Sequence, residues 1–237
     1  MLVNELNNYL KPYNLSLNNQ QLEQFKEYKQ LIIEYNKNVN LTSITDPAEM
    51  LIKHFFDSLT PGFYLDFQNK RVIDIGAGAG FPGIPLKILF PSINLTLLDS
   101  LKKRVIFLEA ACKQLGFDDA YLIHGRAEEL AHDKLHREQY DIVIARAVAR
   151  LNVLMELSLP FARVGGVFVA MKGSKADEEL SEGTSAINIL GGKVSAVYEL
   201  QLPNDCGERS LIIIDKVTKT LAKYPRRPGE PTRKPLM

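Results

Sequence analysis

The chain has 237 residues, of which 46% are hydrophobic and 24% charged, so it is long enough to bury a sizeable core as one domain with an appendage. Its formal net charge is +1 at pH 7, and this charge is unevenly distributed along the chain. The sequence lacks an apolar run of about twenty residues, and its start lacks the basic and apolar regions of a signal peptide. These absences exclude a membrane partner in our interpretation, and we expect a cytoplasmic protein.

The first 69 residues are expected to form an N-terminal helical extension. Asn18 and Gln21 have the spacing of a capping box at a helix start. Asp46, Pro47 and Glu49 have the pattern of a second helix start, with an acid at the cap and a proline in the first turn. The segment 60–69 contains a proline and a glycine, which suits a junction to the next unit.

His54 and Asp57 lie three positions apart in the second of these helices, and two interpretations are open. The two side chains could form a catalytic pair. More commonly, such residues form a surface pair or a hydrogen bond between two elements. We favour the second interpretation, so these residues do not by themselves predict a catalytic base.

A glycine-rich segment follows the extension. Residues 70–85 read KRVIDIGAGAGFPGIP, a short apolar strand followed by four glycines within eight positions. Glycines adopt positive φ readily and let a ligand approach bare backbone, and a helix that begins directly afterwards points free N–H groups at that ligand. The pattern predicts a strand, a ligand-binding loop and a helix start in succession.

Two acids at the ends of neighbouring strands indicate the class of ligand. Asp74 precedes the loop, and Asp99 ends the next strand 25 positions later, where a carboxylate can hold the ribose hydroxyls of a nucleoside. Asp74 would repel the pyrophosphate of a dinucleotide, but it would attract the sulfonium and ammonium groups of S-adenosylmethionine. We therefore predict S-adenosylmethionine as the cofactor. The complete register of Gly78, Gly80 and Gly83 leaves an NAD-dependent oxidoreductase as an alternative.

Strands and helices alternate from residue 71 onward, which predicts an α/β fold with a mostly parallel sheet and helices on both faces. The expected strands are 71–75, 94–98, 120–124, 140–145, 166–172, 193–201 and 209–216. The expected helices are 83–90, 101–115, 126–136, 150–159 and 174–190. A short turn joins the last two strands, so they should pair antiparallel, and the α/β domain should span residues 70–217.

Ligands of such sheets bind beyond the carboxyl ends of the strands, so the loops there hold the candidate contacts. Ala127 and Glu128 follow the third strand, where backbone N–H groups can bind the acceptors of an adenine ring. Glu128 has a second interpretation of equal weight, as an acid that stabilises the first turn of a helix. Arg146 ends the fourth strand, where it can hold a cofactor carboxylate or a substrate phosphate. Lys172 ends the fifth strand and is a candidate RNA contact.

No metal site is predicted. His132 and His136 imitate the spacing of a zinc-binding helix, but an Asp follows the first histidine where the catalytic Glu would stand, and no third ligand is evident nearby. Cys112 and Cys206 lack the spacing of a disulfide framework or a metal site.

The C-terminal tail carries most of the positive charge. Residues 216–237 hold seven basic residues and one acid, a net charge of +6, so the other 215 residues carry −5. Segment 218–237 is also rich in proline, which indicates a tail that is extended or held by partners. This asymmetry predicts a polyanionic partner. The candidate RNA contacts in the tail are Lys223, Arg226, Arg227, Arg233 and Lys234. A tail that merely covers the sheet edge is the alternative.

Several longer strings are spread over almost the whole chain. They are NVNLTSI (38–44), HFFDSL (54–59), VIDIGAGAGFPGIPL (72–86), LLDSLKKR (97–104), GRAEE (125–129), ARAVA (145–149), MKG (171–173) and YPRRPGEPTRKPL (224–236). With this combination the chain resembles the bacterial 16S ribosomal RNA guanine-N7 methyltransferases, the RsmG family, also called glucose-inhibited division protein B.

The resemblance implies a class I S-adenosylmethionine-dependent methyltransferase fold with an N-terminal helical extension, acting on a guanine in the 530 loop of 16S rRNA. It places cofactor contacts on Gly76, Phe81, Ala127, Glu128 and Arg146, with Asp99 at the ribose. Asp74 and Gly78 complete the cofactor site that we predict. The expected partner is 16S rRNA, in the small ribosomal subunit or in an assembly intermediate, and we expect a monomer.

No catalytic side chain is predicted for this reaction. Guanine N7 has a free lone pair on the major-groove edge, so it can attack a methyl group without first losing a proton. The protein then has to extrude the base from its stack and orient it. A non-enzymatic RNA-binding assembly factor is a further alternative, because the basic tail would suffice for that function.

Overall fold

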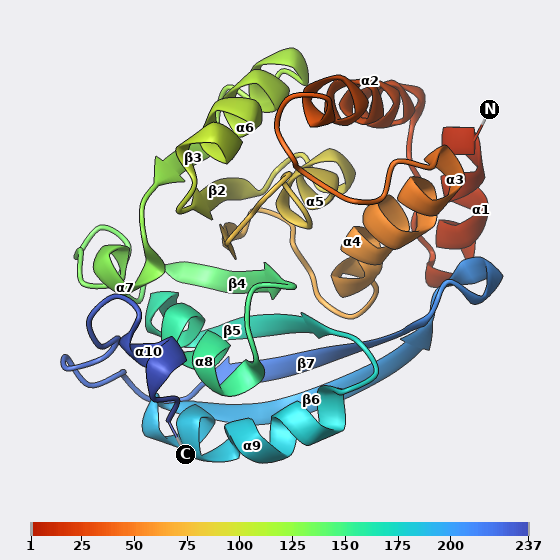
Figure 1. Cartoon of the computed structure of the whole chain (residues 1–237). Coiled ribbons are helices and arrows are strands. Elements are labelled where there is room, and N and C mark those ends of the chain that lie inside the picture. The colour runs from red at the N-terminus through yellow and green to blue at the C-terminus, as the bar shows by residue number, and fades with distance from the viewer. Residues whose placement is uncertain (1, 237) are drawn as a thin grey trace.

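The computed structural model describes residues 2–236 and is built around one seven-stranded sheet (Figure 1). The strands are β1 (Arg71–Ile75), β2 (Asn94–Asp99), β3 (Tyr121–His124), β4 (Tyr140–Arg146), β5 (Ala162–Lys172), β6 (Gly192–Gln201) and β7 (Glu208–Lys216). Their order in the sheet is β3-β2-β1-β4-β5-β7-β6. β7 pairs antiparallel with both β5 and β6, and the other pairs are parallel, which confirms the expected mostly parallel sheet with one antiparallel strand.

The N-terminal extension is helical, as expected. Its segments are η1 (Leu2–Glu5), α1 (Leu6–Leu10), η2 (Lys11–Tyr13), α2 (Asn19–Asn36), α3 (Pro47–Met50), the π-helical turn η3 (Leu51–Phe56), α4 (Asp57–Leu59) and η4 (Thr60–Phe63). The predicted capping box is present, because Asn18 Oδ1 accepts the Gln21 N–H at 3.0 Å and Gln21 Oε1 accepts the Asn18 N–H at 2.8 Å. Asp46 likewise caps α3 by accepting the N–H groups of Ala48 and Glu49.

The remaining helices lie between and after the strands. They are α5 (Gly83–Leu89), α6 (Lys102–Gln114), α7 (Ala127–Leu130), α8 (Leu151–Ser158), η5 (Leu159–Phe161), α9 (Ala176–Ile189), η6 (Pro203–Asp205) and α10 (Glu230–Arg233). The expected helix 126–136 is wrong, because α7 ends at Leu130 and turns follow it. Asp133 accounts for the early end, since its side chain accepts the Leu135 N–H at 2.9 Å and so offers the backbone an alternative to the helical bond.

The sheet separates two clusters of buried side chains. Neighbouring residues on a strand point to opposite faces, so Val72 joins the cluster formed with the extension, α5 and α6, while Ile73 joins the cluster formed with α7, α8 and α9. Ile144 and Val143 divide in the same way on β4. The strands are therefore apolar on both faces, as expected of a parallel sheet covered by helices.

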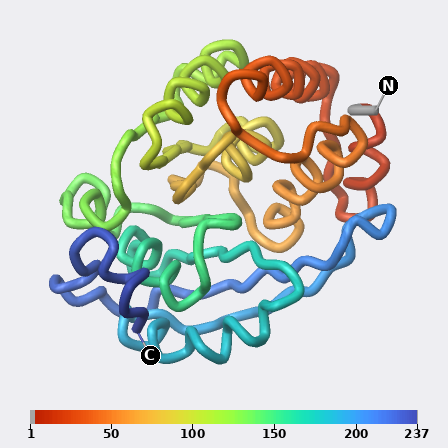
Figure 2. The backbone as a smooth tube through the Cα atoms, in the orientation of Figure 1, coloured from red at the N-terminus to blue at the C-terminus, as the bar shows by residue number. Residues whose placement is uncertain are grey.

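The two ends of the chain lie on different sides of the molecule. The extension, red to orange in Figure 2, lies beside α5 and α6, and the tail after β7, dark blue, lies beside α7 and α8. The extension and the tail thus lie against different helices around the sheet. Within residues 2–236, no helix combines the length and the apolarity needed to cross a membrane.

The capping box at the start of α2 can be tested by mutation. In Asn18→Ala the Gln21 N–H loses its acceptor, so we expect the free energy of unfolding to fall by about 1 kcal/mol. For a chain of this size the melting temperature should fall by roughly 2–4 °C. Calorimetry of Gln20→Ala, an exposed neighbour in the first turn, supplies the control. Equal melting temperatures of the two variants would contradict a contribution of the cap.

Candidate functional site

The glycine-rich loop lies at the carboxyl end of β1 and is fixed against the end of β2. Gly76 donates its N–H to Leu98 O at 2.8 Å, and Gly78 donates its N–H to Asp99 Oδ2 at 2.8 Å. Gly76 has a φ of 70°, and a Cβ there would lie 2.8 Å from Val148 Cγ2. Glycine is therefore required at this position both for the backbone conformation and for space.

Asp99 holds the loop and faces the region beyond the strands. Its side chain is almost completely buried, with Oδ2 bonded to Gly78 and Oδ1 accepting the Leu101 N–H at 2.8 Å. Arg104 Nη1 lies 3.5 Å from Oδ2. Because a carboxylate offers about four lone-pair sites, lone pairs remain for the hydroxyls of a ribose.

A cavity of about 170 Å³ lies beyond β1, β2 and β3, and we call it the nucleoside cavity. It brings together four predicted cofactor contacts, Gly76, Asp99, Ala127 and Glu128. Its apolar lining comes from Ile75, Leu98, Val148 and Leu157. An acid beside apolar walls suits a nucleoside, which has a flat base to bury and hydroxyls to bond. The residues present therefore fit the nucleoside part of S-adenosylmethionine.

A second cavity of about 520 Å³ lies beyond β4 and β5, against the extension, and we call it the basic cleft. Its basic side chains are Lys53, Arg146, Arg150, Lys172 and Arg209, and its acids are Asp57 and Glu179. Val148 lines both cavities, so the two are neighbours. Lys53 also pairs with Glu49 at 2.6 Å, and Arg150 pairs with Glu178 and Glu182, three acids outside the lining. Within the lining itself the basic groups outnumber the acids, which suits an anionic ligand.

Arg146 connects the sheet to the extension. Its Nη1 donates to Asp57 Oδ2 at 3.0 Å and to Lys53 O at 3.1 Å. Arg209 Nε, from β7, lies 3.1 Å from the same Asp57 oxygen. Asp57 is 2% exposed, so two guanidinium groups neutralise a carboxylate that is shielded from water. Removal of either arginine would leave part of a buried charge uncompensated.

His54 and Asp57 do not form a surface pair, and that part of the expectation is wrong. Both are buried, because the extension packs against the sheet. Hydrogen bonds between elements, the other part of the expectation, are present, since His54 Nε2 bonds to Thr42 Oγ1 at 2.7 Å and Asp57 bonds to Arg146. Burial, helped by the charge of Arg146, lowers the pKa of His54 to about 4, so the imidazole is neutral at physiological pH.

Phe81 forms part of the wall between the loop and the extension. Its ring stacks on the His54 ring at a centroid distance of 4.5 Å, and the Arg146 guanidinium lies 4.9 Å from its centroid. Phe81 lines neither cavity. In this structure Phe81 therefore packs against the Arg146 guanidinium group. Its contact with the cofactor stays a prediction.

Asp74 is completely buried beneath the loop and lines neither cavity. Its Oδ2 accepts the Gly83 N–H at 2.9 Å, and its Oδ1 has no hydrogen-bond partner among the described residues. A Cβ on Gly83 would lie 2.9 Å from Asp74 Oδ2, so glycine allows this close approach. Burial raises the pKa of Asp74 to about 7, against the lowering effect of the Gly83 N–H. We interpret Asp74 as a support of the loop.

The side chains predicted to contact RNA differ in their exposure and in whether they pair with an acid. Lys172 is 8% exposed, and its Nζ bonds to Glu179 Oε2 at 2.7 Å. Arg226 is paired with the buried carboxylate of Glu156. Four other tail residues are exposed and form no ion pair within residues 2–236, namely Lys223, Arg227, Arg233 and Lys234.

The two histidines with metal-like spacing are used for other contacts. His132 Nε2 bonds to Pro225 O at 2.8 Å, and His136 Nδ1 bonds to Tyr140 Oη at 2.7 Å. Because α7 ends before either residue, the two do not share a helix face. The described part of the chain contains no cluster of three or more potential metal ligands.

Sequence reasoning missed Arg209 and Val148. Arg209 lies near the start of the last strand, where a charged residue is ordinary, and its contact with Asp57 joins positions far apart in the chain. Val148 follows Ala147, which has a φ of 55°, in the loop after β4. Arg209 belongs to no local pattern that indicates a site, whereas Val148 lies in the string ARAVA (145–149), next to Arg146, and this string could have indicated it.

The raised pKa of Asp74 predicts how stability depends on pH. Between pH 3.8, the ordinary pKa of the carboxyl, and about pH 7, the native protein binds more protons at this site than the unfolded chain. The contribution of Asp74 to the free energy of unfolding therefore falls as pH rises through this window. Asp74→Asn keeps an oxygen acceptor for Gly83 and does not titrate.

We expect the free energy of unfolding of Asp74→Asn, relative to the unmodified protein, to increase from about pH 4 to about pH 7 and to stay level above it. Urea unfolding of both proteins over this range measures the difference. A difference that does not change with pH would contradict the raised pKa.

Comparison with solved structures supports a methyltransferase fold. A putative O-methyltransferase from Klebsiella pneumoniae aligns with a TM-score of 0.58 at 13% identity, covering 90% of this chain and 96% of that chain. TYW2 of M. jannaschii, solved in complex with AdoMet, aligns with a TM-score of 0.55 at 15% identity, covering 74% and 80%. At these identities the likeness concerns the fold alone, and it confirms the expected class I methyltransferase fold.

Comparison of sequences is more specific. Ribosomal RNA small subunit methyltransferase G of Staphylococcus epidermidis (strain ATCC 12228) is 51% identical over 238 residues, covering 100% of this chain and 99% of the relative. The protein of the same name from Staphylococcus aureus (strain Newman) is 50% identical with the same coverage. Residues 21–212 match the family model described as rRNA small subunit methyltransferase G. Taken with the fold and the nucleoside cavity, these matches show that the chain belongs to the rRNA small subunit methyltransferase G family.

Proposed function

We propose that this protein is an S-adenosylmethionine-dependent enzyme that methylates N7 of a guanine in the 530 loop of 16S rRNA. The observation that carries the proposal is the full-length identity of 51% with a ribosomal RNA small subunit methyltransferase G. The guanine-N7 target is what the family resemblance implies. A match of this extent to methyltransferases gives no support to the alternative of an NAD-dependent oxidoreductase.

The residues around the two cavities suit the cofactor. When bound, S-adenosylmethionine supplies an activated methyl group on a sulfonium leaving group. Asp99 would hold the ribose hydroxyls, and the walls of the nucleoside cavity near Ala127 and Glu128 would take the base. Arg146 Nη1 is bonded to Asp57 and Lys53, and its Nη2 lies 3.5 Å from His54 Nδ1. The Nε N–H and the second N–H of Nη2 would hold a carboxylate.

The basic cleft is where we propose that the target nucleotide enters. Its volume of about 520 Å³ suits a nucleotide-sized group, and it adjoins the nucleoside cavity at Val148. An enzyme that acts on a base inside folded RNA has to extrude that base from its stack. Lys53 and Arg209 on the walls of the cleft would meet the phosphates of the extruded nucleotide.

The chemistry at N7 needs no proton transfer by the protein. The lone pair of N7 attacks directly, so orientation of the base is the main task. His54, the histidine of the cleft, has a pKa of about 4 and is neutral. We therefore assign no general base, and we assign Arg146 and its partner Asp57 to positioning.

The exposed basic residues of the tail are the further RNA contacts in this proposal. Lys172 lines the cleft, but its ammonium group is bonded to Glu179 and to Ala149 O, so we assign it to holding the wall of the cleft. We propose that the substrate is 16S rRNA within the small ribosomal subunit or an assembly intermediate, and that the protein acts as a monomer. The cytoplasm is the expected location, because ribosomal RNA is the substrate. Mass mapping of methyl groups on small-subunit rRNA, with and without the protein, tests the activity and the target.

The absence of a general base predicts a flat pH profile. With RNA and cofactor saturating, the single-turnover rate should change little between about pH 6.5 and 8.5, the range in which a histidine base would titrate. RNA that carries 7-deazaguanine at the target should not be methylated, because it lacks the N7 lone pair. A rise of roughly tenfold in rate across this range, or methylation of the 7-deaza RNA, would rule out the proposed chemistry.

The exposed tail residues predict a change in the salt dependence of RNA binding. Each phosphate contact contributes about 0.7 to 0.9 to the slope of log affinity against log salt, so Arg227→Gln with Arg233→Gln should flatten the slope by about one to two units. The matched control is Lys113→Gln with Lys193→Gln, which removes the same charge from exposed positions on α6 and β6. If both double variants give the same slope, the tail does not contact RNA phosphates.

A further inference from the structure

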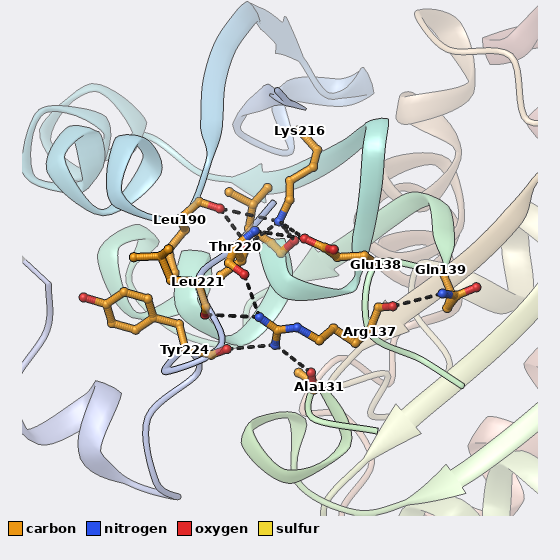
Figure 3. Close-up of polar contacts among 10 residues, drawn as sticks. Ala131, Arg137, Glu138, Gln139, Leu190, Lys216, Thr220, Leu221 and Tyr224 are labelled. Atoms are coloured by element: carbon orange, nitrogen blue, oxygen red, sulfur yellow. Dashed lines mark hydrogen bonds and ion pairs between the residues drawn. The ribbon is translucent and has the colours of Figure 1, made fainter. Parts of the chain in front are cut away.

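The tail that follows β7 is tied to the α/β domain along its first part. Arg137, in the turn before β4, donates to Thr220 O at 2.9 Å and to Tyr224 O at 2.8 Å (Figure 3). Glu138, next to it, accepts the Thr220 N–H at 2.9 Å and lies 3.7 Å from the buried Lys216 ammonium group. The tail therefore leaves the sheet in one fixed direction, toward α7 and α8.

Farther along the tail, Arg226 is held by Glu156 of α8. Its Nε and Nη2 donate to the two carboxylate oxygens at 2.9 Å and 2.6 Å, and its backbone N–H donates to Oε1 at 2.7 Å. Glu156 is 0% exposed. A bidentate pair with a fully buried carboxylate fixes both the position and the orientation of the arginine. The guanidinium group of Arg226 thus binds within the protein, so Arg226 is not among the RNA contacts that we propose.

Beyond Arg226 the tail reaches the nucleoside cavity. Gly229 donates its N–H to Glu128 Oε1 at 3.0 Å, and its φ of 78° allows the chain to turn there. The following residues form α10, and Thr232 of α10 lines the cavity together with Asp99 and Glu128. Leu236 then packs against the buried cluster formed with α8 and α9.

We propose that the C-terminal tail, docked on α8 through the pair of Arg226 and Glu156, is the outer wall of the cofactor site. This inference rests on the proposed function, because it assigns the cavity to the cofactor. The tail then has two roles on two faces, with Thr232 turned to the cavity and the exposed basic residues available to RNA. Tight binding of the cofactor requires the docked tail.

A bulky side chain on the tail that fills the nucleoside cavity tests the proposal. Thr232 is exposed, so Thr232→Trp should fold normally and fill the cavity. We expect at least about a tenfold loss of affinity for S-adenosylhomocysteine by calorimetry. Leu221→Trp is the matched control, since Leu221 is 58% exposed in the same tail and does not line the cavity, and its affinity should equal that of the unmodified protein.

A chain that ends after Arg227 keeps the pair with Glu156 but lacks α10, and it should show a similar loss of affinity. In the unmodified protein, saturating S-adenosylhomocysteine should slow hydrogen exchange of the amides in segment 228–233. Unchanged affinity in Thr232→Trp, or unchanged exchange in this segment, would overturn the proposal. If the unmodified protein itself fails to bind S-adenosylhomocysteine, the result counts against the proposed function instead.

Discussion

The carboxylate of Asp57 is the point at which three parts of the molecule meet. It belongs to the N-terminal extension, and it binds Arg146 from β4 and Arg209 from β7 at 3.0 and 3.1 Å. The charge is shielded from water, so its partners are held in place by the high cost of leaving it unpaired. This carboxylate gathers two of the basic side chains of the basic cleft, and some of their N–H donors remain free.

A second buried carboxylate, that of Glu156, anchors the other end of the chain. Glu156 holds Arg226, and beyond this contact the proline-rich tail reaches the nucleoside cavity, which Thr232 lines. The two segments outside the α/β domain thus each complete one cavity, the extension at the basic cleft and the tail at the nucleoside cavity. The sheet supplies the loops between them, with Asp99 holding the glycine-rich loop in place.

The structure also shows which of the basic residues in the tail are exposed and which are buried or paired. The net charge of +6 on residues 216–237 suggests a tail wholly devoted to a polyanion. In the structure, Arg226 pairs with Glu156, and Lys216 is buried beside Glu138, where desolvation lowers its pKa to about 8. The basic residues that remain exposed lie on the outer face of a docked segment. Part of the tail's charge therefore serves folding, and only the remainder is free for the RNA contacts that we propose.

The sequence by itself determined the sheet, the glycine-rich loop, the helix caps and the place of Asp99, because each depends on a local pattern of apolar residues, glycines or capping side chains. It misled where local signals were weak, as in segment 126–136, where the Asp133 turn ends the helix early. Only the tertiary structure decided that His54 and Asp57 are buried, that Arg209 reaches Asp57 and that Arg226 belongs to Glu156. These contacts join residues far apart in the chain, and their energy comes from burial and charge pairing, which no local spacing encodes.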